Sequence, residues 1–330
     1  MNSHDTTPST HSETRPKMRA IVATAPGGPE VLTEVEVERP TPGPTEILVR
    51  VHAAGVNPID WYIRTVGELG LADYGFPAIL GFDVSGTVEA VGLGVTHLRP
   101  GDEVFGMPQF PQLPGGYAEY VTAPARRFTR KPATLSHVEA AALPLAALTA
   151  WQSLVETARL APGERVLIHA AAGGVGHLAV QIAKEIGAYV IGTARTARHD
   201  FLRNLGADEL IDYTITDFTT AVHDVDVVLD TVGGDYGSRS LQVIRPGGTL
   251  ISLRSPLDVP SPAQAAAAGV HSGFTLVEPD SDGLQKVTDL VEKGSLRPQV
   301  DVVLPLASAA KAHAHGEQGG TSGKIVLSII

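Results

Sequence analysis

The sequence from residue 165 to residue 176 reads Arg165-Val166-Leu167-Ile168-His169-Ala170-Ala171-Ala172-Gly173-Gly174-Val175-Gly176. Its apolar start predicts a buried strand, and its small-residue end predicts a tight elbow. Apolar residues then recur at helical spacing from 175 to 186, and a second apolar run follows at 189–192. A strand, an elbow, a helix and a strand in this order are typical of a dinucleotide-binding unit, and some other tight turn of an α/β sheet is the alternative.

The elbow has the spacing Ala171-x-Gly173-x-x-Gly176, which is the dinucleotide fingerprint with alanine in place of the first glycine. Small residues are needed because the backbone turns sharply and a pyrophosphate must approach it closely. Free N–H groups at the start of the next helix then face the phosphate oxygens. We therefore predict that the cofactor lies against the residues that lead into the helix: Gly173, Gly174, Val175 and Gly176.

The end of the second strand indicates which dinucleotide binds. Units that bind NAD usually carry an acid there, whereas this chain has no acid in residues 192–199. Arg195 and Arg198 stand in that segment instead, with Thr193 as a hydroxyl donor. A 2′-phosphate adds about two negative charges, which repel a carboxylate and attract a guanidinium. The sequence therefore predicts NADPH as the cofactor, and the alternative is that both arginines are simply solvated on the first turn of a helix.

The composition is that of a soluble two-domain enzyme. The chain has 330 residues, a formal net charge of −11 and no cysteine. Its negative charge disfavours nucleic acid or an anionic membrane as the main partner. The lack of cysteine removes disulfides, thiolate metal sites and cysteine nucleophiles. Residues 1–17 are rich in Ser, Thr, His and Pro, which predicts a disordered tail. No apolar run approaches the length of a membrane span, and we expect a cytoplasmic protein.

The order of predicted elements indicates an α/β fold. Strand-like segments punctuated by turns follow one another from residue 18, and helical periodicity begins near residue 136 with an Ala- and Leu-rich segment at 140–154. Strands then alternate with helices up to about residue 277, which is typical of a parallel sheet with helical crossovers. The predicted strand at 274–277 is the last of them. A helix at 284–291, a strand at 300–304, a helix at 307–315 and a strand at 324–329 complete the chain.

The chain resembles a known family, the zinc-free quinone oxidoreductase (zeta-crystallin-like) branch of the medium-chain dehydrogenase/reductase superfamily. Besides the elbow, the matching segments are residues 54–64 (AGVNPIDWYIR), 80–86 (LGFDVSG), 100–106 (PGDEVFG), 116–121 (GYAEYV), 230–234 (DTVGG) and 323–327 (GKIVL). The resemblance implies a GroES-like, β-rich catalytic domain built from residues 18–140 and 279–330. A Rossmann domain with a doubly wound parallel sheet, residues 141–278, is inserted between these two parts. It also implies a homodimer that pairs the strand at 274–277 with its twofold mate.

Departures from the zinc-dependent relatives indicate that no metal is bound. Those enzymes carry Cys and His where this chain has Asn57 and Pro58, and a zinc-binding His where it has Phe82. Neither Asn57 nor Phe82 can supply a thiolate or an imidazole to zinc. The four-cysteine lobe that should follow Gly106 is replaced by residues 107–114, which contain no cysteine. His313 and His315 lie on different faces of their predicted helix, which argues against a shared metal.

The resemblance also assigns site residues. It implies that Asn57 and Tyr62 face the nicotinamide pocket, with Tyr62 as a candidate proton donor or, alternatively, a packed aromatic side chain. Relatives often have lysine at the position of Tyr62, which weakens the donor role, and Asp60 is expected to be structural. It further implies that Lys324 lies near the nicotinamide ribose as a third catalytic candidate. The remaining cofactor contacts that it implies are Thr149 at the nicotinamide ring, Tyr213 beside the 2′-phosphate, Val232, and the backbone of residues 274–277, including Phe274 and Val277.

Three functions stay open at this stage. The first is an NADPH-dependent reductase of quinones or similar conjugated carbonyl acceptors, because a hydride can add to them when only hydrogen-bond donors stabilise the oxyanion. The second is an enoyl-type reductase of activated C=C bonds, such as a tailoring enzyme of secondary metabolism. The third is an NADPH-binding structural or sensor protein with little turnover, since a fold alone does not establish an activity.

Overall fold

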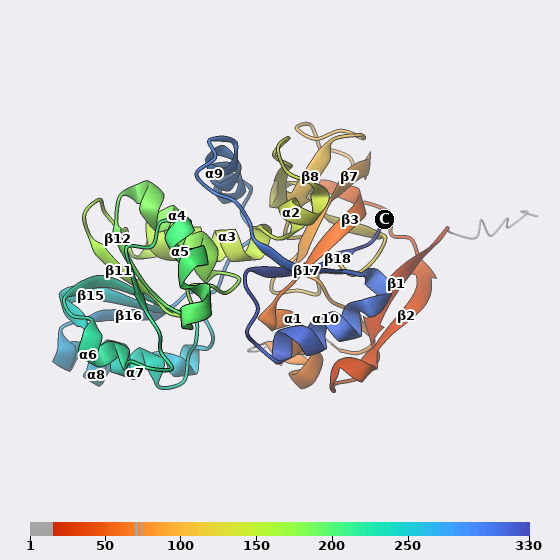
Figure 1. The fold of residues 1–330 in the computed structure, drawn as a ribbon. Coiled ribbons are helices and arrows are strands. Elements are labelled where there is room, and N and C mark those ends of the chain that lie inside the picture. Colours follow the sequence, from red (N-terminus) through yellow and green to blue (C-terminus); the bar gives the residue numbers. More distant parts are fainter. Residues whose placement is uncertain (1–15, 70–71, 74) are drawn as a thin grey trace, which may run out of the picture.

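A computed structural model describes residues 16–69, 72–73 and 75–330 of the chain. The predicted tail, residues 1–17, lies outside the described residues except for its last two. Figure 1 shows two lobes, with helices α3 (Pro144–Trp151) and α9 (Ser281–Glu292) between them. A single cluster of buried apolar side chains extends from one lobe through α3 into the other. Among the described helices, each falls short of the length and hydropathy that a membrane crossing needs.

The first lobe is the β-rich one and is built on a mixed sheet. In spatial order its strands are β10 (Phe128–Arg130), β8 (Glu103–Gly106), β7 (Asp83–Val91), β3 (Glu46–Val56), β18 (Lys324–Ser328) and β17 (Val300–Pro305), with β9 (Tyr120–Pro124) also paired to β3. The C-terminal strands β17 and β18 therefore complete a sheet begun by the N-terminal part, as the resemblance implied. A smaller sheet has the order β2 (Leu32–Glu38), β1 (Lys17–Ala23), β6 (Ala78–Ile79), and β4 (Glu68–Leu69) pairs with β5 (Ala72–Asp73). The helices of this lobe are α1 (Pro58–Val66), α2 (His137–Ala141) and α10 (Ala309–Glu317).

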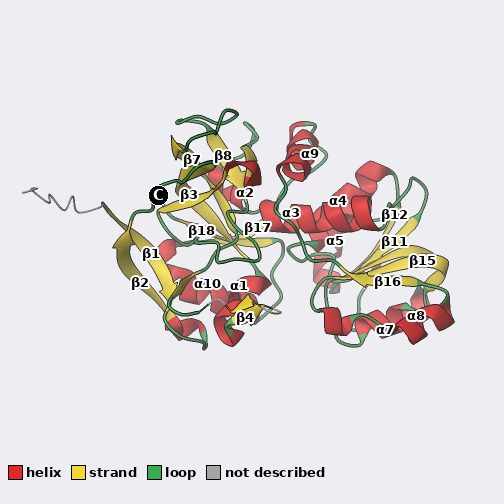
Figure 2. Cartoon of the chain, turned by 180° about the vertical axis from the view of Figure 1, so that it is seen from behind, coloured by secondary structure: helices red, strands yellow, loops and turns green. Residues whose placement is uncertain are grey.

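The second lobe is a six-stranded, all-parallel sheet with helices on both faces (Figure 2). Its strand order is β13 (Glu209–Ile211), β12 (Tyr189–Thr193), β11 (Arg165–Ile168), β14 (Val225–Asp230), β15 (Ile244–Ser252) and β16 (His271–Phe274). This is the strand order of a Rossmann fold. The chain builds the sheet outward in one direction from β11 and then in the other direction from β14, and dinucleotides bind at this switch point between β11 and β14. The helices are α4 (Gly176–Ile186), α5 (His199–Asn204), α6 (Phe218–Ala221), α7 (Tyr236–Ser240) and α8 (Pro262–Ala268). The predicted fold class is confirmed.

Two predicted elements differ in detail. The helical segment at 140–154 is divided into α2, α3 and a π-helical turn at Gln152–Thr157, because Pro144 cannot continue a helix and instead opens α3. The strand predicted at 274–277 is wrong in position, since β16 ends at Phe274. Its partner β15 ends at Ser252, so only the Thr275 N–H still finds a carbonyl there, that of Ser252, at 3.1 Å. The apolar run Phe-Thr-Leu-Val suggested a strand, but it lies beyond the end of the partner strand.

Candidate functional site

The predicted phosphate elbow forms where β11 leads into α4. Ala170 has φ +46°, a left-handed conformation that is uncommon for a residue with a side chain, and its carbonyl accepts a hydrogen bond from the Gly173 N–H at 2.9 Å. Gly176 opens α4, and a Cβ there would lie 2.5 Å from the Ala170 oxygen. Only glycine fits at that position, as the fingerprint requires.

A buried polar network supports the elbow from below. The Thr193 hydroxyl accepts the Ala170 N–H at 3.1 Å and lies 3.3 Å from Nδ1 of His169. The other ring nitrogen of His169, Nε2, lies 3.0 Å from the Ser240 hydroxyl, so each ring nitrogen has a hydroxyl as its hydrogen-bond partner. Burial lowers the pKa of His169 to about 3, so the ring is neutral. The Thr193 hydroxyl is thus hydrogen-bonded beneath the elbow. The bond that we expect between this hydroxyl and a 2′-phosphate stays a prediction.

The two predicted arginines and Tyr213 lie together on the surface beside the elbow. Arg195 precedes the short helix at Thr196–Arg198 and Arg198 is its last residue; both are exposed, and within the described chain neither forms an ion pair with a carboxylate. The Asp212 carboxylate accepts the Thr196 N–H at 2.6 Å, which ties this segment to the loop that carries the exposed Tyr213. Hydrogen bonds from Thr196 and Thr214 hold the pKa of Asp212 well below its usual range. The arrangement is a cationic surface with free donors.

The second part of the site lies where three strands of the mixed sheet end. Ile325 of β18 pairs with Val56 of β3, and Gly55 of β3 pairs with Asp83 of β7. These registers bring together Lys324, Asn57 and Asp83, which are far apart in the sequence. All three side chains are buried, with exposures of 3%, 1% and 0% respectively.

The side chains of Asn57, Asp83 and Lys324, which we call the lysine triad, are hydrogen-bonded to one another. The Lys324 Nζ donates to Asn57 Oδ1 and, at 3.1 Å, to Asp83 Oδ2, which also accepts from Asn57 Nδ2 at 2.9 Å. The second Asp83 oxygen accepts the Leu145 N–H at 2.6 Å. A buried ammonium is tolerated because a carboxylate compensates it. Two of the three ammonium protons have partners among the described residues, so one remains for a ligand.

The lysine triad adjoins the elbow. A Cβ on Gly174 would lie 3.2 Å from Cδ of Lys324, and the Gly323 N–H donates to the Ala172 carbonyl at 2.9 Å. The structure therefore joins the predicted phosphate clamp to two of the three predicted catalytic residues, Asn57 and Lys324.

The other predicted site residues are placed as follows. Thr149 lies on α3, almost buried, and its hydroxyl donates to the Leu145 carbonyl at 2.6 Å. Tyr62 lies on α1 and is 50% exposed, with no hydrogen bond to any described residue. Val232 donates its N–H to Asp230 at 2.9 Å, at the C-terminal end of β14. Phe274 is the last residue of β16, and Val277 is buried in the core.

Sequence reasoning missed Asp83. Asp83 stood in the quoted segment Gly81-Phe82-Asp83, but only Phe82 was weighed there, as the position of a lost ligand. Asp60, expected to be structural, is fully buried and accepts the Asn57 N–H at 2.8 Å and the Gly81 N–H at 2.9 Å. Burial raises the pKa of Asp60 to about 7. The carboxylate thus ties together the backbones beside Asn57 and Asp83.

A nicotinamide dinucleotide fits these residues. The glycine elbow lies at the strand-order reversal, with a cationic surface at one side and the free Lys324 proton at the other. At the same end of the sheet, Ser252 Oγ and Asp230 Oδ2 are buried without a hydrogen-bond partner in the described chain. Such atoms need an explanation, and a polar ligand is one.

A catalytic zinc does not fit. Phe82 is fully buried in the apolar core, in contact with the ring of Phe110, and Asn57 is bonded within the lysine triad. Within the described ranges, no group of three His, Cys, Asp or Glu residues could hold a metal ion. His313 is buried and His315 bonds Asp301 at 2.9 Å, so the two histidines do point to different sides of α10.

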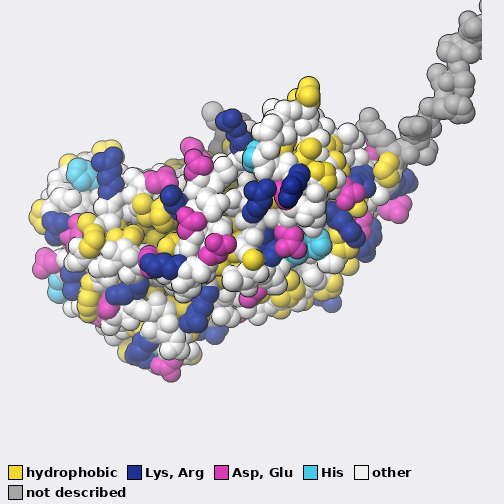
Figure 3. All heavy atoms as spheres, turned by 90° about the horizontal axis from the view of Figure 1, so that it is seen from above, with side chains coloured by type: hydrophobic (Ala, Val, Ile, Leu, Met, Phe, Trp, Pro, Cys, Tyr) yellow, Lys and Arg dark blue, Asp and Glu magenta, His cyan; other side chains and the backbone are white. Residues whose placement is uncertain are grey.

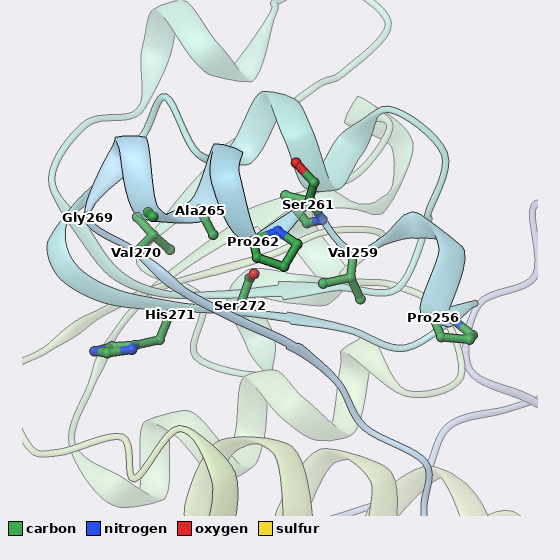
Figure 4. Close-up of a pocket in the computed structure, with 11 residues that line it drawn as sticks. Pro256, Val259, Ser261, Pro262, Ala265, Gly269, Val270, His271 and Ser272 are labelled. Atoms are coloured by element: carbon green, nitrogen blue, oxygen red, sulfur yellow. The ribbon is translucent and has the colours of Figure 1, made fainter.

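Two surface features lie away from the lysine triad. Figure 4 shows a hollow of about 710 Å³ beside β16 and α8, lined by Val259, Pro262, Ala265 and Val270 among others, and none of its lining residues belongs to the predicted site. Figure 3 shows acidic and basic side chains interspersed on the face seen from above, without a large patch of one sign. This face offers no basic stripe of the kind that binds nucleic acid.

Known proteins that are similar to this chain include dehydrogenases and oxidoreductases. Residues 43–133 match the model of the alcohol dehydrogenase GroES-like domain, and residues 205–327 match the model described as zinc-binding dehydrogenase. The chain is 33% identical to the mitochondrial NAD(P)H oxidoreductase RTN4IP1 of Danio rerio, over 87% of this chain and 84% of that protein. It is 34% identical to the 2-haloacrylate reductase of a Burkholderia species, over 93% of this chain and 98% of the relative.

Among solved structures, the chain is similar to the Escherichia coli quinone oxidoreductase complexed with NADPH. The TM-score is 0.84 at 31% identity, covering 94% of this chain and 99% of that one. Fold, site and similarities together define an NAD(P)H-dependent oxidoreductase. The chain belongs to the medium-chain dehydrogenase/reductase family, in its quinone oxidoreductase-like branch.

Proposed function

We propose that the protein is an NADPH-dependent reductase that transfers a hydride to a quinone or another conjugated carbonyl acceptor without zinc. The observation that carries the proposal is the lysine triad beside the elbow. Asn57 of this triad stands where zinc-dependent relatives have a cysteine ligand, and the Lys324 ammonium is bonded to it. A conjugated acceptor suits such a site, because its developing oxyanion needs hydrogen-bond donors rather than a Lewis acid.

The chain's own residues would orient the reactants and exclude water. When bound, the reduced nicotinamide supplies the hydride. Asn57 and Asp83 hold the Lys324 ammonium in one orientation, so its remaining proton donates in a fixed direction, to a ribose hydroxyl or to the acceptor oxygen. Thr149, one helical turn after Leu145, would contact the nicotinamide ring, and the elbow would hold the pyrophosphate. Tyr62 is the proposed proton donor, because it is accessible and its hydroxyl has no partner in the described chain.

The preference for NADPH over NADH rests on Arg195, Arg198 and Tyr213. Both guanidinium groups are exposed and without carboxylate partners among the residues described, and Arg198 is braced by the Gly320 carbonyl at 3.0 Å. A 2′-phosphate would supply an anionic partner for these two guanidinium groups. The similar E. coli enzyme, which was crystallised with NADPH, supports this choice.

One experiment tests the proposal. The oxidation of NADPH and of NADH is followed at 340 nm with 1,4-benzoquinone and with 2-cyclohexenone as separate acceptors. We expect NADPH oxidation with the quinone, and a much lower kcat/KM with NADH. Turnover of the enone alone would identify the second candidate, a C=C reductase, which the similarity to 2-haloacrylate reductase favours. Tight NADPH binding without turnover of either acceptor would support the third candidate, a structural or sensor protein.

We also propose a homodimer with a cytoplasmic location. The strand β16 is the last in its sheet, so one of its edges is unpaired in a single chain, and a twofold mate would cover it. Sedimentation velocity at micromolar concentration tests this, with a dimer of about twice the chain mass of 34.5 kDa as the expected species. The domain boundaries at residues 140/141 and 278/279 are likewise proposals.

A further inference from the structure

The side chain of Gln152 holds the backbone of Glu278, which lies 126 positions further along the chain. Its amide nitrogen donates to the Glu278 carbonyl at 2.9 Å, and its amide oxygen accepts the Glu278 N–H at 3.0 Å. A side-chain amide carries a donor and an acceptor side by side, so it can pair with both groups of one residue, as a neighbouring strand does. Gln152 is only 8% exposed and begins the π-helical turn that follows α3. We call these two bonds the Gln152 clamp.

The segment of residues 275–278 leaves the end of β16 and is fixed at both of its ends. The Thr275 N–H donates to the Ser252 carbonyl at 3.1 Å, and the clamp holds the other end. Between them, the N–H and C=O groups of Leu276 and Val277 have no hydrogen-bond partner among the described residues. Val277 is only 6% exposed. Because the backbone groups of buried residues are almost always paired, these groups indicate a place for a ligand.

Helix α3 places this segment close to the lysine triad. Its first turn is bonded to the triad, because the Leu145 N–H donates to Asp83 at 2.6 Å. Thr149 follows one turn later, with its hydroxyl on the Leu145 carbonyl. Residues 145, 149 and 152 have the spacing of one helix face. Thr149 therefore lies between the lysine triad at one end of α3 and the Gln152 clamp at the other.

Helix α9 anchors the chain just beyond the clamp. Asp280 accepts the N–H groups of Asp282 at 3.0 Å and of Gly283 at 2.7 Å, so it caps the N-terminus of α9. This end of α9 packs closely on α3, since a Cβ on Gly283 would lie 2.8 Å from Cδ2 of Leu148. Figure 1 shows the two helices next to each other between the lobes. The residues after Glu278 are thus fixed by their own contacts, and the clamp fixes the segment before it.

We propose that Gln152 is a positioning residue, which holds the peptide groups of Leu276 and Val277 toward the carboxamide of the nicotinamide. The inference rests on the proposed function, because it takes the nicotinamide ring to lie at Thr149. A carboxamide has a C=O acceptor and an NH2 donor, and unpaired peptide N–H and C=O groups are their complements. Two such bonds oppose rotation of the ring about its bond to the ribose. They therefore decide which of the two hydrogens at C4 of the ring points to the acceptor.

The direct test is Gln152→Met, which keeps an unbranched side chain of similar length and removes both bonds of the clamp. Titration calorimetry compares NADPH with 2′,5′-ADP, a ligand that has the 2′-phosphate but no nicotinamide. NADPH binding should weaken by about tenfold, because two neutral hydrogen bonds contribute about this much. The affinity for 2′,5′-ADP should stay within about twofold, since this ligand does not reach the segment. If both ligands lost affinity by the same factor, or if neither did, the proposal would be overturned.

Gln181 provides a matched control, because it makes the same pair of bonds beyond the other end of α9. Its amide donates to the Arg297 carbonyl at 3.1 Å and accepts the Arg297 N–H at 3.0 Å, and it is 6% exposed. Gln181→Met should lower the urea midpoint about as much as Gln152→Met does, but the affinity for each ligand should stay within about twofold. A tenfold loss of NADPH affinity in Gln181→Met would contradict the proposal, because the effect would then follow from the loss of either pair of bonds.

A second variant covers the case in which Gln152→Met does not fold. Gln152→Asn keeps a polar amide, but its side chain is one methylene too short to reach Glu278. Its NADPH affinity should fall by about tenfold, with 2′,5′-ADP binding within about twofold of the wild type. Wild-type affinity for both ligands in Gln152→Asn would overturn the proposal.

The choice of hydrogen is a readout that a loss of stability does not change. Each of the two hydrogens at C4 of NADPH is replaced by deuterium in turn, and mass spectrometry measures the deuterium that NADP⁺ retains after quinone reduction. The wild type should transfer one hydrogen and retain the other. In Gln152→Met, transfer of the wrong hydrogen should rise by about tenfold, because the bonds that bind the carboxamide also fix the ring. Gln181→Met should behave as the wild type, and unchanged selection in Gln152→Met would overturn the positioning role.

The titrations separate this inference from the proposed function. If the wild type bound no NADPH, the proposed function would fail and this inference with it. If the wild type bound NADPH and reduced a quinone while Gln152→Met kept the wild-type ratio of the two affinities, only the role of Gln152 would fail. A selective loss of NADPH affinity in Gln152→Met would support that role even in a protein that reduced no acceptor.

Discussion

Lys324 and Asp83 form an ion pair whose two side chains are almost completely removed from solvent, with exposures of 3% and 0%. A buried ion pair is weak evidence for stability by itself, but each charge alone would be very unfavourable in this place. The effects of this ion pair on stability and on activity can therefore be measured separately.

Asp83→Asn should destabilise the protein by about 3–5 kcal/mol, because it leaves the ammonium buried without a counter-charge. The double variant Asp83→Asn/Lys324→Met removes both charges and should recover most of this stability, but not the activity. Urea unfolding and kcat of the single and double variants measure the two effects. If the double variant were no more stable than Asp83→Asn, the ion pair would not be the source of the loss.

Arg195 and Arg198 are expected to discriminate between the two dinucleotides. Each charge-assisted contact to a phosphate contributes about 1.5–3 kcal/mol, so alanine at either position should weaken NADPH binding by about tenfold or more. NADH binding should stay within about twofold, since that cofactor has no 2′-phosphate. Fluorescence titration of both cofactors provides the measurement, and Arg203→Ala, which removes a surface guanidinium paired with Asp200, is the control. Unchanged NADPH affinity in both variants would remove the basis for our assignment.

At the scale of elements, sequence reasoning predicted the features that depend on neighbouring residues, and it missed the features that depend on the register between strands. The elbow, the alternation of strands and helices and the amphipathic α9 were predictable, because small residues and apolar periods are written in adjacent positions. The meeting of Lys324 with Asn57 and Asp83 depends on the registers of β18 on β3 and of β3 on β7. No local pattern specifies such registers. The end of β16 was mispredicted for the same reason, since its partner strand decides where pairing stops.

Thr193, at the end of β12, supports the elbow at the end of β11. In Thr193→Val the Ala170 N–H loses its acceptor at a residue that already has positive φ, so we expect a loss of about 1–3 kcal/mol in unfolding free energy. The affinity for NADH and for NADPH should fall by a similar factor, because both cofactors share the pyrophosphate. Thr220→Val, at an exposed threonine of α6, should change stability by less than about 0.5 kcal/mol. If Thr193→Val weakened the binding of NADPH but not of NADH, Thr193 would instead be assigned to the 2′-phosphate.

At the scale of the whole molecule, a buried histidine connects the two lobes. His177 of α4 donates from Nδ1 to the Gly173 carbonyl at 2.9 Å, and its Nε2 accepts the N–H of Gln299 at 3.1 Å. Gln299 in turn accepts the N–H of Lys324 at 2.9 Å. A single neutral ring thus links the phosphate elbow to the strand that carries the lysine. Burial lowers the pKa of His177 to about 4.

The buried histidines make the fold sensitive to acid. His169, His177 and His313 have pKa values of about 3, 4 and 3 in the folded protein, well below the ordinary 6.5. Above pH 6.5 they are neutral in both states, so their contribution to stability is fully present. Between pH 6.5 and 4 only the unfolded chain takes up these protons, so stability falls with the pH. Asp60 acts in the opposite sense in this range, because its folded pKa is raised to about 7, and it offsets one histidine.

In this pH range the unfolded chain therefore binds two more protons than the folded protein, which corresponds to a slope approaching about 2.7 kcal/mol per pH unit near pH 5. Urea unfolding at pH 7, 6 and 5 measures it. His177→Gln can keep one donor and one acceptor between the lobes but cannot be protonated, so the slope should fall by about half. His315→Gln, at a half-exposed position, should leave the slope unchanged. If His177→Gln had the wild-type slope, the acid sensitivity would have to come from carboxylates such as Asp102 and Glu119, whose pKa values are lowered, rather than from the ring that joins the lobes.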